Sequence, residues 1–416
     1  MVQDDSFYKD LTWQWLFGHL ADENCILIKG EGPDFILGWN FTDELKVKDD
    51  RLDFSVLDSF LNKHTGKFIF GCLTYDLKNS VEPTLTSSNS DLIEFPLIHF
   101  FVAAHVMEFK NNVWNFYGEG TKHAVEKLSE RHEHKINAAS NPVLLKEKTT
   151  KEAYIKLVNT IKSEIQYGNI YELNYCVSFE AEHIELNSQA VFHKLYSLTS
   201  APFSVYLNTP EHSVLCASPE RFLKKEGNKI ISQPIKGTAR RSQDETEDQQ
   251  IKAELKSNPK ERAENIMITD LVRNDLSKIA VKNSVNVDEL CGVYTFKTVH
   301  QLISTISCDV LPEINFSSVI KAAFPMGSMT GAPKVSAMKI AEKTEQFKRG
   351  LYSGSIGFIR PNGDFDFNVV IRSILHSKKN KTVSCSVGSA ITINSDPEKE
   401  YEECLLKLNA LKKALE

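Results

Sequence analysis

The fold is decided by the stretch Tyr352-Ser-Gly-Ser-Ile-Gly-Phe-Ile-Arg-Pro-Asn-Gly-Asp-Phe-Asp-Phe-Asn-Val-Val-Ile-Arg-Ser-Ile-Leu375. Two apolar runs, 352–359 and 365–375, flank Pro361-Asn-Gly-Asp364, which is typical of the tight turn of a β-hairpin. A third run, 382–391, predicts another strand, and residues 397–415 carry a helical apolar stripe. We therefore expect an α+β fold of layered antiparallel β-sheets with flanking helices, because hairpins and helices mix along the chain.

Helical and strand patterns alternate upstream of this stretch as far as about residue 150. Helices are predicted over 152–166 and 260–275, and a strand is predicted over 229–233. Residues 121–148 are charged and show no sustained alternation, so we interpret them as a helix and a connection. This stretch separates an N-terminal portion, which holds all four tryptophans, from the rest of the chain.

Composition excludes several classes of protein. The 416 residues include 41% hydrophobic side chains, too many for a disordered chain, and the net charge of −6 offers no basic field for nucleic acid. The longest apolar run, 95–107, is shorter than the ~20 residues of a membrane span. The acidic start Met1–Asp5 is unlike a secretory signal, and the eight cysteines lack zinc or redox spacing. We expect a protein of the reducing cytoplasm.

Carboxylates occur on the apolar faces of two predicted helices. In the helix 260–275, Glu264 falls near the middle of the apolar arc and Glu261 at its edge. Glu400 and Glu403 flank the apolar stripe of the closing helix. Two such pairs could bind a hard cation such as Mg²⁺, or they could be helix-surface carboxylates paired with Arg or Lys. Spacing alone leaves both interpretations open. The arc of the first helix consists of Met267, Ile268, Leu271 and Val272.

Three further features could hold or attack an anionic substrate. The stretch Phe324–Lys334 places small residues before a helix, where backbone N–H groups either bind an anion or form an ordinary N-cap. Arg372 could clamp a carboxylate with its planar guanidinium, or lie on an exposed polar sheet face. Lys236 follows a strand and precedes a glycine, so it either projects into a cleft as a nucleophile or lies in solvent.

Nine sequence blocks, in this order, resemble the chorismate-utilising enzymes, a family that includes anthranilate synthase component I, aminodeoxychorismate synthase component I, and the isochorismate and salicylate synthases. They cover essentially all of residues 150–416, and Phe70–Leu77 also resembles the N-terminal part of the family. The blocks are Tyr167–Asn174, Ser218–Phe222, Pro234–Thr238, Glu261–Asp275, Thr298–Ser304, Phe324–Lys334, Tyr352–Phe358, Asn368–Ser373 and Gly388–Glu403. The resemblance implies one interlocked domain, with residues 1–140 as the N-terminal portion of the synthase domain and residues 147–416 as the chorismate-binding catalytic region.

Within the family, Pro-Ile-Lys236-Gly-Thr resembles the aminodeoxychorismate synthase branch, since anthranilate synthases usually carry Ala at this position. The resemblance implies that Lys236 attacks C2 of chorismate while Glu220 protonates the departing C4 hydroxyl. Ammonia then adds at C4 and expels the lysine, giving 4-amino-4-deoxychorismate for 4-aminobenzoate and folate synthesis. This is a transferase reaction.

The resemblance also implies a set of binding residues. Mg²⁺ would be held against the ring carboxylate by Glu264 and Glu403, with Glu261 and Glu400 in support. Arg372 and Tyr352 would grip the enolpyruvyl carboxylate, with a loop at Gly388 closing over it. The remaining residues implied to line the substrate site are Thr238, His300, Thr330, Gly331 and Lys334.

Some features depart from the family pattern. Glu172 stands where these synthases mostly carry Gln and where the isochorismate and salicylate enzymes carry a water-activating Lys. Ser389 and Ala390 replace two glycines, and Cys404 replaces a Thr. No Leu-Leu-Glu-Ser block of a tryptophan feedback site is present, so we do not expect tryptophan to inhibit.

No cysteine lies in the Gly-x-Cys-x-Gly elbow of class I glutaminases, so we expect a separate glutamine amidotransferase subunit to supply ammonia. The alternative activity is that of anthranilate synthase component I, with amination at C2 and loss of pyruvate. In that case His300 would help to remove a proton. A third alternative is a non-catalytic paralogue that binds chorismate without turning it over.

Overall fold

The structure is a computed structural model, and it describes residues 11–20, 23–30, 32–128, 142–297 and 299–416. The acidic Met1–Asp5 and the expected boundary near residue 140 lie outside the described residues. Along the described ranges no helix is long and apolar enough to span a bilayer.

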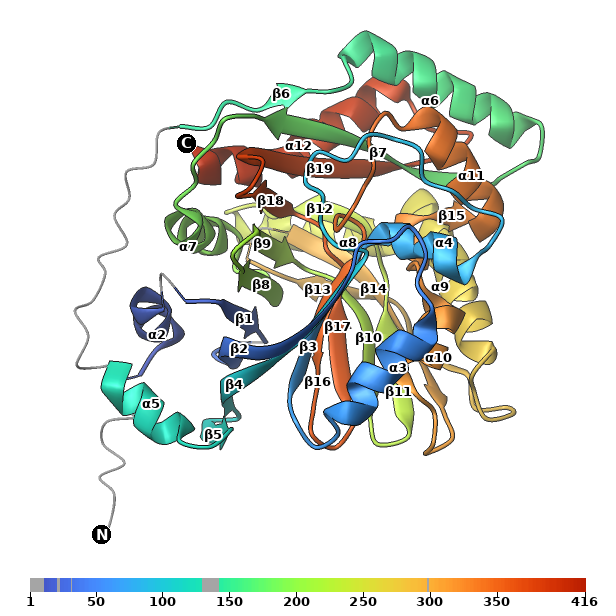
Figure 1. The fold of residues 1–416 in the computed structure, drawn as a ribbon. Helices are drawn as coiled ribbons and strands as arrows, with labels where there is room; N and C mark the ends of the chain where they lie inside the picture. The colour runs from blue at the N-terminus through green and yellow to red at the C-terminus, as the bar shows by residue number, and fades with distance from the viewer. Residues whose placement is uncertain (1–10, 21–22, 31, 129–141, 298) are drawn as a thin grey trace.

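The N-terminal portion is built on long antiparallel strands (Figure 1). Its central strand, β4, pairs with β2 and β3 and forms a hairpin with β5 through the turn at 111–112. The strands are β1 (Cys25–Lys29), β2 (Phe35–Val47), β3 (Ile69–Leu73), β4 (Ile98–Lys110) and β5 (Val113–Tyr117). The helices are α2 (Trp13–His19), α3 (Phe54–Lys63), η1 (Tyr75–Leu77), α4 (Lys78–Val81) and α5 (Thr121–Leu128).

The remaining strands form antiparallel ladders, as expected from the hairpin pattern. They are β6 (Lys146–Glu147), β7 (Glu172–Ala181), β8 (Phe203–Asn208), β9 (His212–Ser218), β10 (Arg221–Glu226), β11 (Lys229–Gln233), β12 (Ile235–Arg240), β13 (Asn286–Thr295), β14 (Val299–Asp309), β15 (Gly331–Ala332), β16 (Ser355–Ile359), β17 (Phe365–Asn368), β18 (Ser373–Ser377) and β19 (Thr382–Ile391).

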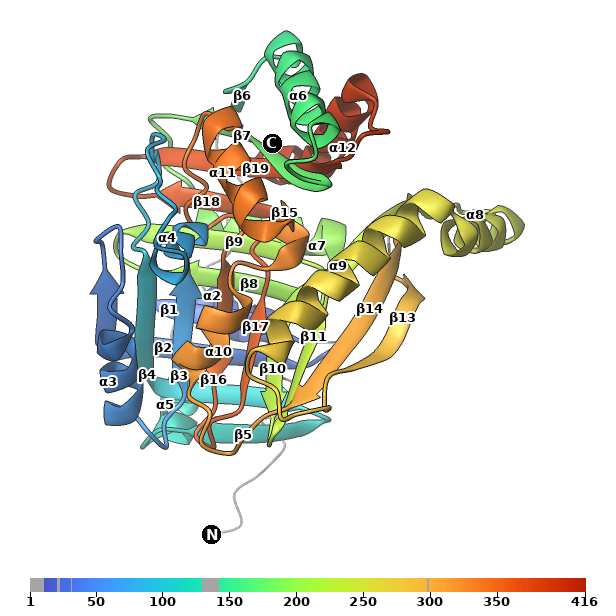
Figure 2. The same cartoon turned by 90° about the vertical axis from the view of Figure 1, so that its right-hand side faces the viewer.

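Helices flank these ladders on their outer faces (Figures 1 and 2). They are α6 (Lys151–Gln166), α7 (Ser188–Thr199), α8 (Glu245–Ser257), α9 (Pro259–Ser277), α10 (Phe316–Ala323), η2 (Gly327–Met329), α11 (Lys334–Thr344) and α12 (Pro397–Leu415). Side chains cap their N-termini: Asn258 accepts from the first-turn amides of α9, and Asp396 does the same for α12. The predicted α+β class is confirmed.

The N-terminal strands are interleaved with the rest of the chain. β1 pairs with β8, and β3 pairs with β16, so strands from both portions share one continuous ladder. One end of the ladder runs through β9, β18, β19 and β7, and the other runs through β17, β10, β11 and β14. The two portions therefore form a single interlocked domain, as expected.

Two large apolar clusters fill the space between the layers. One joins β7, β19 and the helices α2, α6, α7 and α12 through residues such as Tyr154, Phe192 and Leu408. The other joins the opposite end of the ladder to α3, α9 and α10 through residues such as Phe100 and Phe316. Figure 2 shows α9 running obliquely across β10, β11 and β14, and this position brings its N-terminal half toward the end of β12.

The hairpin that decides the fold forms around residues 361–364, but its second strand is interrupted. The predicted strand 365–375 is β17 followed by β18, because the chain leaves the partners of β17 and joins β9 instead. Arg372, at this break, has a positive φ of 53°. The predicted strand 352–359 begins only at Ser355, because Ser353 also has a positive φ, of 62°. At both breaks the side chains no longer alternate between the two faces of the sheet.

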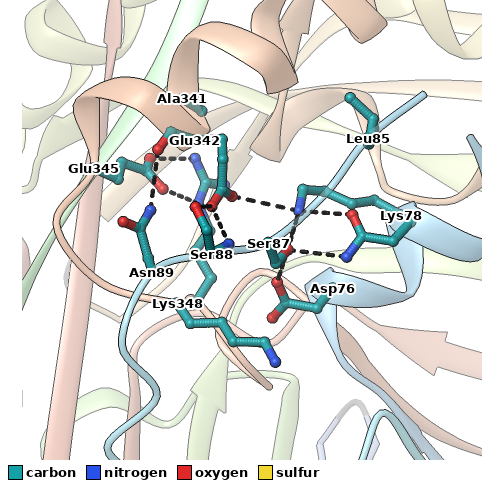
Figure 3. A network of polar contacts seen from close by, with 12 residues as sticks. Asp76, Lys78, Leu85, Ser87, Ser88, Asn89, Ala341, Glu342, Glu345 and Lys348 are labelled. Atoms are coloured by element: carbon teal, nitrogen blue, oxygen red, sulfur yellow. Dashed lines mark hydrogen bonds and ion pairs between the residues drawn. The ribbon is translucent and has the colours of Figure 1, made fainter. Parts of the chain in front are cut away.

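A polar strap ties α11 to the N-terminal portion (Figure 3). Glu342 of α11 accepts a hydrogen bond of 2.7 Å from the backbone N–H of Ser88 and lies 3.7 Å from the buried Lys78 ammonium. Ser87 in turn donates to Asp76 at 2.6 Å. Because α11 directly follows β15, the strap also fixes the strand that supports the site described next.

Candidate active site

The centre of the candidate site is an ion pair between β12 and β7. Lys236 Nζ donates to Glu172 Oε1 at 2.7 Å, and the Glu172 side chain has no exposed surface. Burial alone would lower the pKa of Lys236, but the charge and hydrogen bond of Glu172, together with the charges of Glu264 and Glu220, outweigh burial and raise this pKa. Lys236 is therefore held as an ammonium in a buried position rather than in solvent.

Two glycines set the geometry of this pair. Gly237, with φ +93°, lies where the β12–β14 ladder shifts register, and so it re-aims the neighbouring Lys236. Gly331 of β15 has φ +149°, and a Cβ there would lie 2.2 Å from the Glu172 carbonyl oxygen. A side chain at Gly331 would therefore displace the start of β7, from which Glu172 projects. Asn265 of α9 also donates to the Lys236 carbonyl, at 3.3 Å.

Glu220 lies in the short connection between β9 and β10 and is only 4% exposed. Ser328 Oγ of η2 donates to its Oε1 at 2.6 Å. Burial raises the pKa of Glu220 to about 7, although the Ser328 hydrogen bond and the charge of Lys236 oppose this rise. A carboxyl with this pKa can give up or accept a proton at neutral pH, as a general acid must.

The four predicted metal-site carboxylates come from α9 and α12. Burial raises the pKa of Glu264 to about 7, and its Oε1 has no hydrogen-bond partner among the described residues. Burial raises the pKa of Glu261 as well, and the charges of Glu403 and Glu400 add to this rise. These shifts show that the two helices gather negative charge in one place.

Lysines neutralise part of that charge. Lys260 Nζ lies 3.9 Å from Glu264 Oε1 and 3.7 Å from Glu400 Oε1, so one ammonium bridges the two helices. Lys407 pairs with Glu403 at 2.6 Å and lowers its pKa despite burial. Within the described ranges no three carboxylates, imidazoles or thiols lie close enough to hold a metal ion. The alternative interpretation, helix-surface carboxylates paired with Arg or Lys, predicted lysine partners of this kind. It did not identify Lys260, although the i,i+4 spacing of Lys260 and Glu264 could have indicated the pair.

The predicted apolar arc of α9 is rotated in the structure. Met267 and Leu271 are only half-buried, whereas the buried side chains of the helix are Asn265, Ile268, Thr269, Val272, Asp275 and Leu276. The physical reason is that Asn265 is drawn inward by hydrogen bonds to β12 and β14. Glu264 is consequently half-buried at the margin of the arc instead of lying at its middle.

Arg372 and Tyr352 come together at the two interrupted strands. Burial lowers the pKa of Arg372, the charge of Tyr352 counters this, and no hydrogen bond or ion pair reaches its guanidinium from any described residue. The Tyr352 hydroxyl is hydrogen-bonded to the Cys176 thiol, and burial raises its pKa. A half-buried guanidinium without a protein partner is suited to bind an anionic group.

Two other predicted substrate residues, Gly388 and Lys334, are held within the protein framework. Gly388 does not lie in a closing loop: it lies within β19, opposite Cys176 of β7, and its carbonyl accepts from Lys407 at 2.8 Å. The prediction of a loop is wrong because the β7–β19 ladder continues through this residue as far as Ile391. Lys334 directs its ammonium to Asp275 and to the carbonyls of Ala323 and Pro325, so it braces the loop before η2.

His300, Thr238 and Thr330 are also engaged with protein groups. His300 is 1% exposed, and its ring nitrogens contact Asp248 and the Thr295 hydroxyl at 3.0 Å each. Thr238 is exposed on β12 and lies 3.5 Å from Gln301. Thr330 is buried beside Gly331, where its carbonyl accepts from Asn174 at 2.9 Å.

A separate cavity of about 500 Å³ lies between β1, β2 and β4 on one side and β10, β16 and β17 on the other. Its charged side chains pair with one another: Arg221 with Asp366, and Arg360 with Glu108. Lys29 reaches the carbonyls of residues 33 and 34, and burial lowers its pKa to about 8. Neither Lys236 nor Glu172 lines this cavity. Arg221, which follows Glu220 in the chain, does line it.

The chain is 41% identical over 271 residues to a probable aminodeoxychorismate synthase, chloroplastic, of Oryza sativa subsp. japonica, a match that covers 64% of the chain and 30% of the relative. It is 31% identical over 362 residues to aminodeoxychorismate synthase component 1 of Bacillus subtilis, covering 83% of the chain and 76% of the relative. The chain thus spans less than a third of the rice protein's length.

Among solved structures, anthranilate synthase component I from Streptococcus pneumoniae TIGR4 superposes with a TM-score of 0.82 at 24% identity, covering 92% of each chain. This likeness shows a shared fold. The family model for chorismate binding enzymes matches residues 23–413, which include every residue of the candidate site. The chain therefore belongs to the family of chorismate binding enzymes.

Proposed function

We propose that the chain aminates chorismate at C4 to give 4-amino-4-deoxychorismate, in the synthesis of 4-aminobenzoate and folate. The observation that carries the proposal is the buried Lys236, which lies within the electrostatic reach of Glu220, a carboxyl with a pKa of about 7. Relatives named aminodeoxychorismate synthase in rice and Bacillus subtilis support it.

In this reaction Lys236 Nζ, once uncharged, forms a bond to C2 of chorismate. The ring electrons shift, the C4–O bond breaks, and Glu220 gives its proton to the departing hydroxyl, which leaves as water. Ammonia then bonds to C4 and the C2–Nζ bond breaks, so that lysine is regenerated and the enolpyruvyl ether is retained. Burial supports the role of Glu220, since only a raised pKa keeps a carboxylic acid protonated near pH 7.

Glu264 and Glu403, supported by Glu261 and Glu400, would hold Mg²⁺. A bound Mg²⁺ supplies positive charge to the ring carboxylate of the substrate and eases loss of the leaving group. The chemistry of the donors supports this ion, because carboxylate oxygens are the ligands that Mg²⁺ prefers and Glu264 Oε1 has no hydrogen-bond partner among the described residues, although the four carboxylates are not gathered around one point in this structure. In this structure Lys260 supplies positive charge to two of these carboxylates, Glu264 and Glu400.

Arg372 and Tyr352 would bind the enolpyruvyl carboxylate. Arg372 is half-buried, and the described part of the chain provides its guanidinium with no carboxylate within ion-pair distance. A substrate carboxylate would complete its hydrogen bonds in a bidentate arrangement.

The test uses purified protein, chorismate, Mg²⁺ and ammonium at mildly alkaline pH, with and without 4-amino-4-deoxychorismate lyase. We expect 4-aminobenzoate only when the lyase is present. Anthranilate and pyruvate formed without the lyase would instead establish the alternative, anthranilate synthase activity. Lys236 disfavours that alternative, and both ring nitrogens of His300 are already engaged, by Asp248 and Thr295.

We also propose that a separate glutamine amidotransferase subunit supplies the ammonia. All eight cysteines of the chain are buried, and burial raises the pKa of thiols such as Cys176 and Cys404. Such thiols are poor nucleophiles toward glutamine. The isolated chain should use ammonium and not glutamine, and efficient use of glutamine would contradict this. The eight free thiols also favour a reducing compartment such as the cytoplasm.

A further inference from the structure

Arg349 is a buried arginine in the connection between α11 and β16. Only 4% of it is exposed, and its guanidinium pairs with Glu345, four residues earlier, at 2.5 Å. Its Cζ lies over the Tyr75 ring, 4.3 Å from the ring centroid. A buried ion pair contributes little net stability, since an apolar pair of similar volume often stabilises as much. The hydrogen bonds of Arg349 therefore show more about its role than its charge does.

All five N–H donors of Arg349 are used. Two of them donate to the two oxygens of Glu345, at 2.8 and 2.5 Å. The others reach the carbonyl of Met329 at 2.7 Å, the carbonyl of Asn174 at 2.9 Å and the Ser353 hydroxyl at 3.3 Å. Because the donors of a guanidinium lie in one rigid plane, they fix the positions of these acceptors relative to one another.

The Met329 carbonyl connects this guanidinium to the acid of the proposed reaction. Met329 ends η2 and directly follows Ser328, whose hydroxyl donates to Glu220 Oε1 at 2.6 Å. η2 is a single turn of three residues, and a turn this short is held mainly by its surroundings. The hydrogen bond to the Met329 carbonyl therefore helps to place the hydroxyl that supports Glu220.

The Asn174 carbonyl connects the same guanidinium to the nucleophile. Asn174 lies on β7 two residues after Glu172, which pairs with Lys236 at 2.7 Å. On the same strand, the Cys176 N–H donates to Glu345 Oε1 at 3.0 Å. The buried ion pair therefore holds β7 at two backbone positions close to Glu172.

We propose that Arg349 is a positioning residue that aligns the acid with the nucleophile by tying η2 to β7. The inference rests on the proposed amination, which needs both groups at once: Lys236 bonds to C2 while Glu220 protonates the hydroxyl that leaves C4. A displacement of about 1 Å can cost about 100-fold in rate. Through the Ser353 hydroxyl, Arg349 also holds the residue that follows Tyr352.

Arg349→Lys keeps the positive charge but carries its donors on one nitrogen, which cannot reach acceptors on both segments. We expect kcat to fall about 10- to 100-fold. We also expect the Ser328 hydrogen bond to Glu220 to weaken as η2 shifts. That bond lowers the pKa of Glu220, so the limb of kcat that falls at high pH should move up by roughly half a pH unit. The groups that act on the Glu220 carboxyl, namely Ser328, Lys236 and the backbone of Ile235, all remain in the variant.

A double variant tests whether this shift passes through η2. If Arg349 acts by placing Ser328, then Arg349→Lys/Ser328→Ala should show the same limb as Ser328→Ala alone. Two shifts that add would show independent effects and would overturn the proposal. An unmoved limb in Arg349→Lys would leave that residue with a structural role only and would overturn it as well.

The matched control is Arg360→Lys. Arg360 is also paired at 2.5 Å with a buried carboxylate, that of Glu108, but it lines the separate cavity. This variant should lose stability as Arg349→Lys does, yet keep the kcat and the limb of the wild type. Rates are measured well below the melting temperature of each protein. A limb that moves equally in both variants would show general loosening and would contradict the inference.

A charge-free variant keeps the test valid if lysine at this position prevents folding. Arg349→Met/Glu345→Gln removes both charges at similar volume and leaves an amide oxygen to accept from the Cys176 N–H. Methionine cannot donate to the Met329 carbonyl, so we expect the same loss of kcat and the same shift of the limb. A folded protein with wild-type kcat and limb would overturn the proposal.

Hydrogen exchange followed by mass spectrometry supplies a readout without turnover. The Met329 and Thr330 amides donate to the carbonyls of Met326 and Gly327, and in Arg349→Lys they should exchange about tenfold faster. In the control variant they should exchange as in the wild type. Unchanged exchange in Arg349→Lys would show that this residue does not hold η2.

The two proposals fail in different ways. If wild-type protein forms no 4-amino-4-deoxychorismate, the proposed function fails, whatever the exchange shows. If wild-type protein forms it and Arg349→Lys keeps the wild-type kcat and limb, the function stands and the role of Arg349 fails.

Discussion

Ser328 Oγ donates a 2.6 Å hydrogen bond to Glu220 Oε1 and thereby joins the buried acid to the loop that precedes α11. The two residues are 108 positions apart in the chain. The hydrogen bond lowers the pKa of Glu220, which burial has raised to about 7, so Ser328 tunes the pH at which the acid is protonated.

Removing this hydrogen bond should shift the pH dependence of the enzyme. Glu220 acts while protonated, so wild-type kcat is expected to fall by up to tenfold per pH unit above about pH 7. In Ser328→Ala the pKa rises further, and the falling limb should move to higher pH. Steady-state kinetics across pH 5.5–9 tests this. Ser317→Ala, at another buried serine on α10, is the control, and a limb unmoved in both variants would contradict the role of Ser328.

Glu220 also makes stability depend on pH. Its pKa is raised on folding from 4.5 to about 7, so the unfolded chain binds fewer protons between these values, and stability falls as pH rises through this window. The ionised acid costs roughly 3 kcal/mol at pH 8. Glu220→Gln should therefore unfold at a higher temperature than wild type at pH 8, with the gain absent at pH 4.5. A gain of equal size at both pH values would contradict this assignment.

Lys236→Ala should abolish C4 amination or divert the product toward anthranilate. It also leaves the enclosed Glu172 side chain without its cation, and breaking a buried ion pair by removing one partner costs about 3–5 kcal/mol of unfolding free energy. The double variant Lys236→Ala/Glu172→Gln removes both charges and should recover most of that stability, but not the activity. Denaturant unfolding and product analysis separate the two effects. Unchanged 4-amino-4-deoxychorismate formation by the double variant would exclude Lys236 from the mechanism.

Arg372 should act mainly on substrate binding. Arg372→Lys keeps the charge but loses the planar pair of donors, so we expect KM for chorismate to rise about 10- to 100-fold with a smaller change in kcat. Arg360→Lys, at a guanidinium already paired with Glu108, is the control. An effect on kcat alone would show that Arg372 does not hold the ground-state substrate.

Lys260 should compete with Mg²⁺ for Glu264 and Glu400. Removing it in Lys260→Ala should lower the Mg²⁺ concentration for half-maximal activity by about 5-fold, because a partly exposed pair contributes up to about 1 kcal/mol. Calorimetric titration with MgCl₂ provides a measurement independent of activity. Lys256→Ala, at an exposed lysine near the end of α8, is the control, and weaker Mg²⁺ binding in Lys260→Ala would place the ion elsewhere.

Local pattern was sufficient for several elements. The strands over 229–233 and 382–391 and the helix over 397–415 have the predicted bounds, because each is fixed by its own periodicity and by turn or cap residues at its ends. The partial burial of the Glu264 carboxylate could also be inferred from sequence, since a carboxylate near the apolar arc of a helix is unusual. The metal and substrate roles stay predictions.

The sequence by itself determined the α+β class, the family and the identity of the chemically able side chains, because these depend on residue type and short-range spacing. Tertiary structure alone decided which of those side chains meet. The Lys236–Glu172 pair spans 64 residues, the break at Arg372 comes from a change of strand partner, and Gly388 lies in a ladder rather than a loop. Each depends on the register and packing of distant segments, which no local periodicity specifies.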